Sequence, residues 1–250
     1  MIVGSNVMHS EKVSSTNTVA AAMLRESPPA EGTAITASYQ ETGRGQSGNR
    51  WESEPGKNLL MSVILYPVMV RPAEQFIISV MVSLAVHDLV SQYTPLARIK
   101  WPNDIYVGDD KIAGILIENS ITGETLGSSI AGIGLNINQS VFLSGAPNPV
   151  SLCQVTGCEH DLSTITRDLL MALDRRYDMI IRGKRIELEE EYFKALYRAH
   201  EWHRYSDNEG EFEGMIESVR PDGMLEVRKR EGVTRLYAFR ELDYILLPCH

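Results

Sequence analysis

Two stretches of this sequence combine residue types that bind and activate anions. The first spans residues 100–118 and reads K-W-P-N-D-I-Y-V-G-D-D-K-I-A-G-I-L-I-E. Short strands are predicted on both sides of its P-N turn, and a tight G-D-D turn follows. This pattern predicts a hairpin with Asp104, Lys111 and Gly114 at one end. Glycine lets a ligand approach the backbone, and lysine is a point charge suited to a carboxylate or a phosphate. The alternative is an exposed hairpin whose aspartate and lysine are only solvated.

The second stretch, residues 43–51, reads G-R-G-Q-S-G-N-R-W and follows a predicted strand at residues 34–40. Glycines, arginines and an asparagine at this density are typical of a loop whose amides and guanidinium groups wrap an anion. The letters also fit the G-x-G-x-x-G dinucleotide fingerprint, which needs a helix at the last glycine and an acidic residue roughly 20 positions later. Because a strand-like run follows instead at residues 59–65, a nicotinamide oxidoreductase is not favoured. A solvated turn is the other alternative.

Together these motifs resemble the biotin protein ligase family, enzymes that use ATP to join biotin to a lysine of a carrier protein. The family's glycine-arginine loop, its K-W-P-N-D run and its K-x-A-G-I-L-x-E strand occur here in order, at residues 43–51, 100–104 and 111–118. Ser15-Thr16-Asn17 and a G-I-G-L-N run at residues 132–136 extend the match to both sides. Motifs in the right order are a much stronger signal than any one of them. The resemblance covers about residues 10–140 strongly and the rest in outline.

The resemblance implies a role for each matched residue. The family's Ser-Thr-Asn group contacts the ureido ring of biotin, its glycine-rich loop orders over the adenylate, and its asparagine after G-I-G-L faces the nucleotide. Carried over, the expected ligand-binding residues are Ser15, Thr16, Asn17, Gln40, Gly43, Arg44, Gly45, Gln46, Gly48, Asn49, Arg50, Trp51, Lys111, Gly114 and Asn136. Capping of a helix that begins near residue 15 would explain the first three equally well, and Asn136 could simply cap a turn.

The implied chemistry needs positive charge beside an acid. A carboxylate does not acylate an amine at neutral pH until its oxygen becomes a leaving group, and adenylation by ATP supplies one. Arg44, Arg50, Lys111 and Mg²⁺ would stabilise the negative charge that builds at the α-phosphate, with Lys111 the foremost catalytic candidate. Asp104 would orient the incoming carrier lysine or receive its proton, and it is also the expected metal ligand.

The glycine-arginine loop departs from the family pattern, and the sequence also offers candidates for an apolar slot that would hold biotin. Gln46, Ser47 and Asn49 stand where basic residues are often found, which predicts weaker retention of the adenylate. The apolar part of biotin needs an apolar slot, for which Trp51 and one of residues 115 and 116 are candidates. Alternation along a strand prevents both of the last two from facing it.

Composition and charge narrow the class of protein. The 250 residues carry a formal charge of −9, which argues against a general nucleic-acid binder because neutralising phosphates needs clustered lysine and arginine. Three cysteines without C-x-x-C spacing favour free thiols over a disulfide framework or a zinc site. The lack of a signal-peptide pattern and of a run of about 18 apolar residues predicts a cytoplasmic protein without a membrane partner.

The pattern of segments predicts an α+β fold in two units. Residues 1–203 are expected to form a central mixed or antiparallel sheet packed with helices, as in class II aminoacyl-tRNA synthetases and biotin ligases. Helices are predicted at residues 72–93, 161–182 and 187–199. His87 lies on the first of these, which is apolar around most of its circumference, and we interpret it as structural. Short alternating segments broken by glycine predict a small SH3-like β barrel at residues 204–250.

The resemblance also implies the partners. The protein partner would be a biotin carboxyl carrier domain of a biotin-dependent carboxylase, and the protein would be a monomer or weak homodimer. Because the Ser-Thr-Asn motif begins at Ser15, we expect a monofunctional ligase with no helix-turn-helix before it and no DNA partner. A non-catalytic biotin sensor or repressor remains an alternative. A lipoate ligase is another, although its R-R-x-x-G-G-G run is not found.

Overall fold

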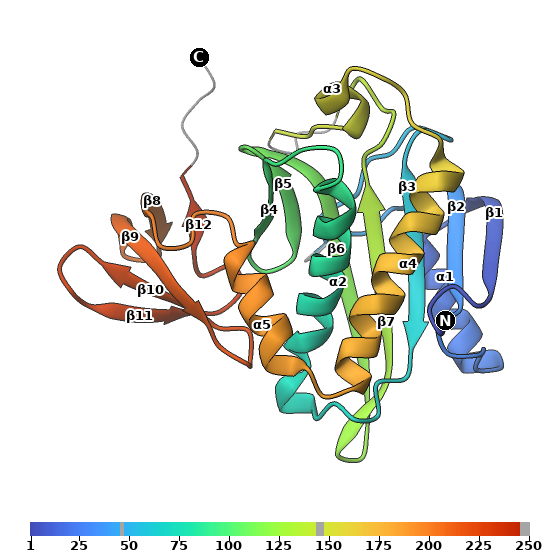
Figure 1. Ribbon diagram of the computed structural model, residues 1–250, viewed down its shortest axis with the longest axis horizontal. Helices are drawn as coiled ribbons and strands as arrows, with labels where there is room; N and C mark the ends of the chain where they lie inside the picture. Colours follow the sequence, from blue (N-terminus) through green and yellow to red (C-terminus); the bar gives the residue numbers. More distant parts are fainter. Residues whose placement is uncertain (46–47, 144–147, 246–250) are drawn as a thin grey trace.

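The computed structural model describes residues 1–45, 48–143 and 148–245, which form a large sheet with helices and a smaller second sheet (Figure 1). The large sheet has seven strands in the order β1-β2-β3-β7-β6-β5-β4. Their bounds are Val7–Val13 (β1), Ala34–Gln40 (β2), Leu59–Leu65 (β3), Ala97–Lys100 (β4), Asp104–Val107 (β5), Asp110–Thr122 (β6) and Thr125–Leu135 (β7). Among these strands only β1 and β2 pair in parallel, so the prediction of a mixed or antiparallel sheet is confirmed, and the sheet is mixed.

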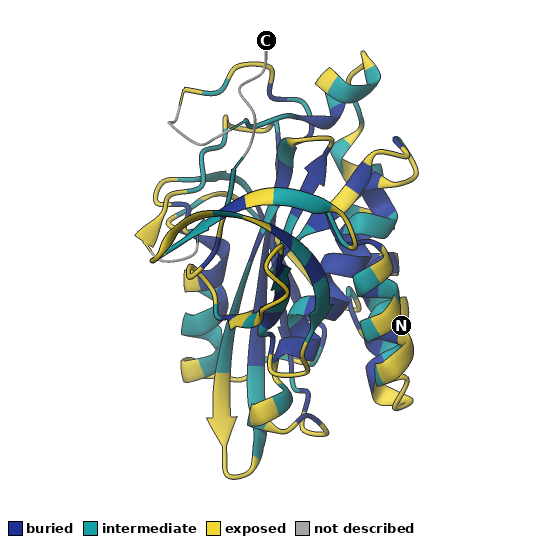
Figure 2. Ribbon diagram, turned by 90° about the vertical axis from the view of Figure 1, so that its left-hand side faces the viewer, coloured by how far each residue is buried: buried dark blue, intermediate teal, exposed yellow. Residues whose placement is uncertain are grey.

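Helices cover both faces of this sheet unequally. Their bounds are Thr16–Glu26 (α1), Phe76–Val90 (α2), Leu152–Thr156 (α3), Leu162–Ile181 (α4) and Arg185–Lys194 (α5). On one face α2 and α4 cover the main core, whereas α1 covers part of the other face through a small cluster that includes Ala20, Ile64 and Ile130 (Figures 1 and 2). Beyond α1, the indole of Trp51 covers part of that second face.

The helix α2 is the buried centre of the molecule. The segment Pro72–Val90 is long and apolar enough to cross a membrane, but most of it is enclosed by the sheet and by α4, which is typical of a core helix. The predicted helix at residues 72–93 is shorter in the structure, because a separate 3-10 turn, Pro72–Glu74, precedes it. His87 lies within hydrogen-bonding distance of Ser91, and burial lowers the pKa of its imidazole.

The helix predicted at residues 187–199 is wrong at both ends. Helix α5 is Arg185–Lys194, and the chain beyond it pairs with the edge strand β4 instead of continuing the helix. The amide of Ile99 donates to the carbonyl of Ala195, and the amide of Tyr197 donates to the carbonyl of Ile99. Pairing with the open sheet edge satisfies these backbone groups and ends the helix early.

The second sheet contains five antiparallel strands in the order β11-β10-β9-β8-β12. Their bounds are Trp202–Asp207 (β8), Gly210–Val219 (β9), Leu225–Lys229 (β10), Thr234–Tyr237 (β11) and Asp243–Tyr244 (β12). The predicted SH3-like C-terminal module is thus confirmed, while the division at residues 203 and 204 remains a proposal. The module contacts the first sheet closely, because the Trp101 indole donates to the Gly223 carbonyl and its ring packs on Phe239.

Candidate active site

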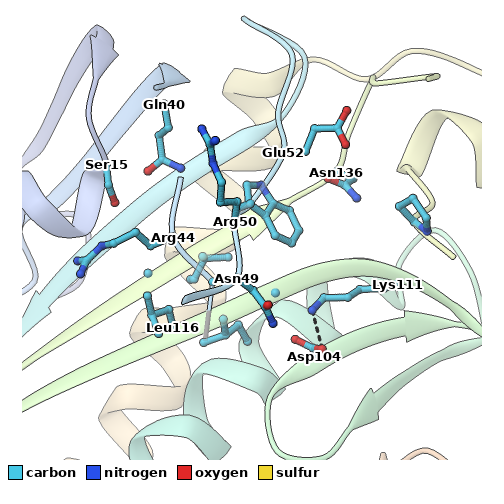
Figure 3. Close-up of a pocket in the computed structure, with 18 of the residues that line it drawn as sticks. Ser15, Gln40, Arg44, Asn49, Arg50, Glu52, Asp104, Lys111, Leu116 and Asn136 are labelled. Atoms are coloured by element: carbon cyan, nitrogen blue, oxygen red, sulfur yellow. Dashed lines mark hydrogen bonds and ion pairs between the residues drawn. The ribbon is translucent and has the colours of Figure 1, made fainter. Parts of the chain in front are cut away.

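A cavity of about 570 Å³ opens on the face of the large sheet that α1 covers only in part (Figure 3). Positions 130, 132 and 134 of β7 share this face. Ile130 packs against α1, and the two glycines beyond it leave room for the side chains of Asn17 and Trp51 to lie against the sheet. The residues that line it are Ser15, Thr16, Asn17, Gln40, Arg44, Gly45, Asn49, Arg50, Trp51, Glu52, Lys100, Asp104, Tyr106, Lys111, Gly114, Ile115, Leu116, Gly132, Ile133, Gly134, Asn136, Phe142 and Pro149.

Most residues predicted from the motifs converge on this cavity. Among those predicted, Gly43 and Gly48 do not line it, and Gln46, like Ser47, lies outside the described residues. Gly43 shapes the loop instead: its carbonyl accepts from the amide of Trp51, and a Cβ there would lie 2.6 Å from the Trp51 carbonyl oxygen. Gly48 has a φ of 85°, which glycine adopts without strain.

The base of the cavity is a neutral hydrogen-bond network at the start of α1. The amide and hydroxyl of Thr16 both donate to Gln40 Oε1, at 2.7 and 3.1 Å. The hydroxyl of Ser62 lies 2.7 Å from Thr16 Oγ1 and 2.6 Å from Asn17 Oδ1. Ser15 is the N-cap residue, but its side chain makes no capping hydrogen bond, so capping does not account for it. The network fixes which way the Thr16, Asn17 and Gln40 side chains present donors and acceptors.

Glu118 connects this network to the glycine-arginine loop. It accepts hydrogen bonds from Asn17 Nδ2 at 2.7 Å and from Arg44 Nη2 at 2.9 Å. The Arg44 guanidinium therefore lies beside Glu118, and Figure 3 shows it pointing away from Lys111. Arg50 donates to the carbonyl of Glu41 and is exposed to solvent. Arg44 and Lys111 both line the cavity, where Arg44 pairs with Glu118 and Lys111 pairs with Asp104.

The indole of Trp51 lies against two glycines that are paired across β6 and β7. A Cβ on Gly134 would lie 2.4 Å from Trp51 Cε2, and a Cβ on Gly114 would lie 2.9 Å from Trp51 Cζ3. No larger residue fits at either position without moving the ring. Leu116 shares the sheet face of Gly114, whereas Ile115 belongs to the core on the other side, as strand alternation requires. Trp51 Nε1 is buried and has no hydrogen-bond partner among the described residues.

Two lysines, an aspartate and a tyrosine form the wall opposite the network. Lys111 Nζ lies 2.6 Å from Asp104 Oδ2, with both side chains about a quarter exposed. Lys100 donates to the hydroxyl of Tyr106 at 3.1 Å. Burial lowers the pKa of Lys100, an effect that the negative charge of Asp104 opposes, and burial raises the pKa of Tyr106. Sequence reasoning missed Lys100 and Tyr106, although position 106 shares the strand face of position 104.

Asn136 supplies an acceptor rather than a cap. Its side-chain amide donates to the Val150 carbonyl at 3.1 Å, and its backbone amide donates to the Ile112 carbonyl. Its Oδ1 atom is buried and has no partner among the described residues. A buried amide oxygen without a partner is costly, so it points to a donor on a ligand, such as an exocyclic amine.

The protein groups of the cavity fit a magnesium ion only if phosphates of a bound nucleotide supply the remaining ligands. Within residues 1–45, 48–143 and 148–245, no three histidine, cysteine, aspartate or glutamate side chains gather as a metal site. Asp104 is a single carboxylate that already contacts Lys111. Mg²⁺ is commonly held by one or two carboxylates together with substrate phosphates, which matches this arrangement.

Comparison with known proteins identifies the family. Residues 10–136 match the model of the biotin/lipoate A/B protein ligase family. The chain is 29% identical over 245 residues to the bifunctional ligase/repressor BirA of Bacillus spizizenii, covering 95% of this chain and 74% of that protein. It is 33% identical over 150 residues to the biotin–[acetyl-CoA-carboxylase] ligase of Paracoccus denitrificans, covering 57% of this chain and 62% of that protein.

Solved structures show the same fold. The biotin protein ligase from Aquifex aeolicus, in complex with biotin and ATP, superposes with a TM-score of 0.79 at 23% identity, covering 96% of this chain and 100% of that one. The chain belongs to the biotin/lipoate A/B protein ligase family, and the resemblance to biotin protein ligases is confirmed. The dinucleotide-binding alternative fails, because the sheet is largely antiparallel and no helix lies between Gly48, the last glycine of the pattern, and β3.

Proposed function

We propose that this protein is an ATP-dependent biotin protein ligase that forms biotinyl-5′-AMP and transfers the biotinyl group to a specific lysine of a biotin carboxyl carrier domain. The observation that supports this most strongly is the order of groups along one cavity. A neutral donor and acceptor network stands at one end, a paired lysine and aspartate at the other, and a glycine floor between them.

The neutral end suits the ureido ring of biotin. A ureido group offers one acceptor and two donors, which the hydroxyl of Ser15 and the fixed side chains of Thr16, Asn17 and Gln40 can match. Burying a neutral ligand against a charge would cost desolvation without a matching gain, so uncharged partners are appropriate here. Trp51 and Leu116 would line the apolar slot beside the glycine floor.

The charged end suits the adenylation step. The carboxylate of biotin attacks the α-phosphate, and the bond between that phosphorus and the pyrophosphate oxygen breaks. Lys111 would lie between carboxylate and phosphate and neutralise the charge that builds there. Arg44 would exchange its contact with Glu118 for a phosphate oxygen, and Asn136 Oδ1 would accept from the nucleotide. Mg²⁺ would be held by Asp104 and the phosphates and would add positive charge.

In the second step the carrier lysine attacks the mixed anhydride and releases AMP. Asp104 lies beside Lys111 in the cavity wall and would orient the attacking amine or accept its proton. We propose the carrier domain as the protein partner. We also propose a cytoplasmic monomer or weak homodimer that does not bind DNA, which the net charge of −9 favours.

One experiment separates the ligase activities of the family. The protein is incubated with ATP, magnesium and either biotin or lipoate, and the acyl-adenylates are identified by mass spectrometry. We expect biotinyl-adenylate with the wild type and a severe loss with Lys111→Ala. Lipoyl-adenylate alone would establish the lipoate alternative, and biotin binding without any adenylate would establish a sensor.

A further inference from the structure

Lys100 lies where the second sheet meets the cavity. Its Nζ atom lies 4.9 Å from the ring centres of both Tyr106 and Tyr244, and it donates to the Tyr106 hydroxyl. Tyr106 belongs to β5 of the large sheet, and Tyr244 belongs to β12 of the small sheet. The ammonium group is therefore held between aromatic faces supplied by two different sheets, an arrangement that attracts a cation.

Lys100 differs from the other basic residues of the cavity in its partners. Lys111 contacts Asp104 and Arg44 contacts Glu118, each within 3 Å. Arg50 is exposed to water. Lys100 is desolvated and, among the described residues, makes no ion pair with a carboxylate. A part-buried ammonium group that makes no ion pair with a carboxylate is costly, so its position in the wall points to an anion that arrives with the ligand.

The position of Lys100 indicates which part of that anion it meets. Lys111 is on β6, next to the Gly114 floor and Trp51, where biotin's carboxylate and the α-phosphate are proposed to meet. Strand β5 separates β6 from β4, which ends at Lys100. Neighbouring strands are about 4.8 Å apart, so Lys100 faces the cavity further from the biotin slot than Lys111 does.

We propose, on the basis of the ligase function above, that Lys100 binds the β- and γ-phosphates of ATP and stabilises pyrophosphate as it leaves, with Tyr244 positioning the ammonium group. When the α-phosphorus gains its bond to the biotin carboxylate, the electron pair of the broken bond stays on the pyrophosphate oxygen. The Lys100 ammonium neutralises part of that charge without giving up a proton. The C-terminal sheet thereby contributes to the nucleotide site.

Binding of inorganic pyrophosphate tests Lys100 without requiring any ligase activity. Titration calorimetry compares the wild type with Lys100→Met and with Lys57→Met, a control that removes the same charge from a surface lysine paired with Glu159 outside the cavity. Charge-assisted contacts of this kind correspond to affinity changes of about tenfold or more. We expect that loss for K100M and less than a twofold change for K57M. Equal pyrophosphate affinity in wild type and K100M, or no pyrophosphate binding by either, would overturn the assignment.

Stability and kinetics separate a functional lysine from a structural one. K100M removes a desolvated charge that has no carboxylate partner, so we expect its Tm to equal or exceed that of the wild type. Because the proposed contact is with the phosphates, the KM for ATP should rise and the KM for biotin should stay unchanged. A K100M protein with a lower Tm and an unchanged KM for ATP would show a purely structural role. A defect confined to transfer from purified adenylate would place Lys100 at the carrier amine instead, and would equally contradict pyrophosphate binding.

Tyr244 gives a second, graded test. The Tyr244 hydroxyl is buried without a partner among the described residues, so only the ring acts on Lys100. Tyr244→Leu removes the ring and should weaken pyrophosphate binding, and the conservative variant Tyr244→Phe should restore it. Pyrophosphate affinity that is equal in Y244L and wild type would remove Tyr244 from the proposal. Lys100-dependent pyrophosphate binding in a protein that forms no biotinyl-adenylate would retain this site and refute the ligase function alone.

Discussion

Two lysine–aspartate pairs in this protein are chemically alike and lie in opposite surroundings. In the cavity, Lys111 Nζ lies 2.6 Å from Asp104 Oδ2, and the side chains are 28% and 27% exposed. In the C-terminal sheet, Lys229 Nζ lies 2.9 Å from Asp207 Oδ2, and the side chains are 9% and 1% exposed. Nearly equal distances therefore conceal very different access to water and to ligands.

The pairs also differ in how fully the carboxylate is used. Asp207 accepts from Lys229, from the Tyr237 hydroxyl at 2.8 Å and from the Glu209 amide at 2.9 Å, so protein groups surround it. Asp104 accepts one side-chain hydrogen bond, from Lys111, among the described residues. A saturated buried pair stabilises one fold, whereas a part-exposed pair with spare lone pairs and donors can exchange partners when a ligand arrives. The contrast distinguishes a structural pair from a reactive one.

The largest expected effect is a loss of stability when the Lys229–Asp207 pair of the C-terminal sheet is broken. Asp207→Ala leaves the Lys229 ammonium buried without its nearest carboxylate, which should lower the free energy of unfolding by about 3–5 kcal/mol. Urea unfolding followed by circular dichroism measures this. Glu213→Ala is the control, because Glu213 and Arg230 are more than half exposed and such pairs contribute at most about 1 kcal/mol. Equal shifts in the two variants would remove the distinction between buried and exposed pairs.

The next effect is on rate, in the cavity pair. Lys111→Ala should slow single-turnover formation of biotinyl-adenylate by about 10²–10³-fold, as for loss of one donor to a developing anion. Its free energy of unfolding should change by no more than about 1 kcal/mol, because the pair is part-exposed. Loss of the C-terminal pair would then reduce stability, whereas loss of the cavity pair would reduce the rate of adenylation. Unchanged adenylation in this variant would mean that Lys111 is not the residue between carboxylate and phosphate.

A smaller effect is expected at the acid of the cavity pair. Asp104→Asn keeps the shape and removes the charge, so transfer of biotin from purified adenylate to a carrier domain should fall by about ten- to a hundredfold. Adenylation is assayed separately, and any loss there reflects a magnesium role. Transfer at the wild-type rate would show that Asp104 takes no part in aminolysis.

Local sequence patterns predicted the structural features that lie within one short segment of the chain. Strands β2 and β3 have the predicted bounds, and the hairpin that holds Asp104 and Lys111 forms as expected because its turns are encoded locally. Helix α4, Leu162–Ile181, follows its apolar periodicity and begins after Asp161, whose side chain caps it. These features depend on neighbours in sequence.

Contacts between distant segments could not be read in this way. Strand β1 is mostly exposed and lacks an apolar pattern, so nothing local distinguishes it from a loop, although β2 pairs with it. The contact of Glu118 with Arg44 joins segments 74 residues apart, and Lys100 meets Tyr244 only once both sheets are in place. The residue types were visible in the sequence, but their meeting point is set by the register of the sheet and by packing between the two units.

The smallest predicted effect uses pH to separate the two pairs. Burial alone would raise the pKa of Asp207, but hydrogen bonds from Lys229, the Glu209 amide and Tyr237 outweigh it and lower the pKa from 3.8 to about 2. A carboxyl whose folded pKa is depressed contributes stability that is complete above its unfolded pKa and disappears as pH falls through the folded value.

The free energy of unfolding of the wild type should therefore approach that of Asp207→Asn as pH falls from about 5 to about 2. Asp161 also has a pKa near 2, held by Ser163 and Thr164 at the start of α4, so Asp161→Asn is measured alongside to separate its contribution. Its carboxylate is exposed, and its variant should follow the wild type more closely across the whole range. A gap between wild type and D207N that stays constant with pH would mean that the charge of Asp207 does not stabilise the C-terminal sheet, and the two pairs would then differ in exposure alone.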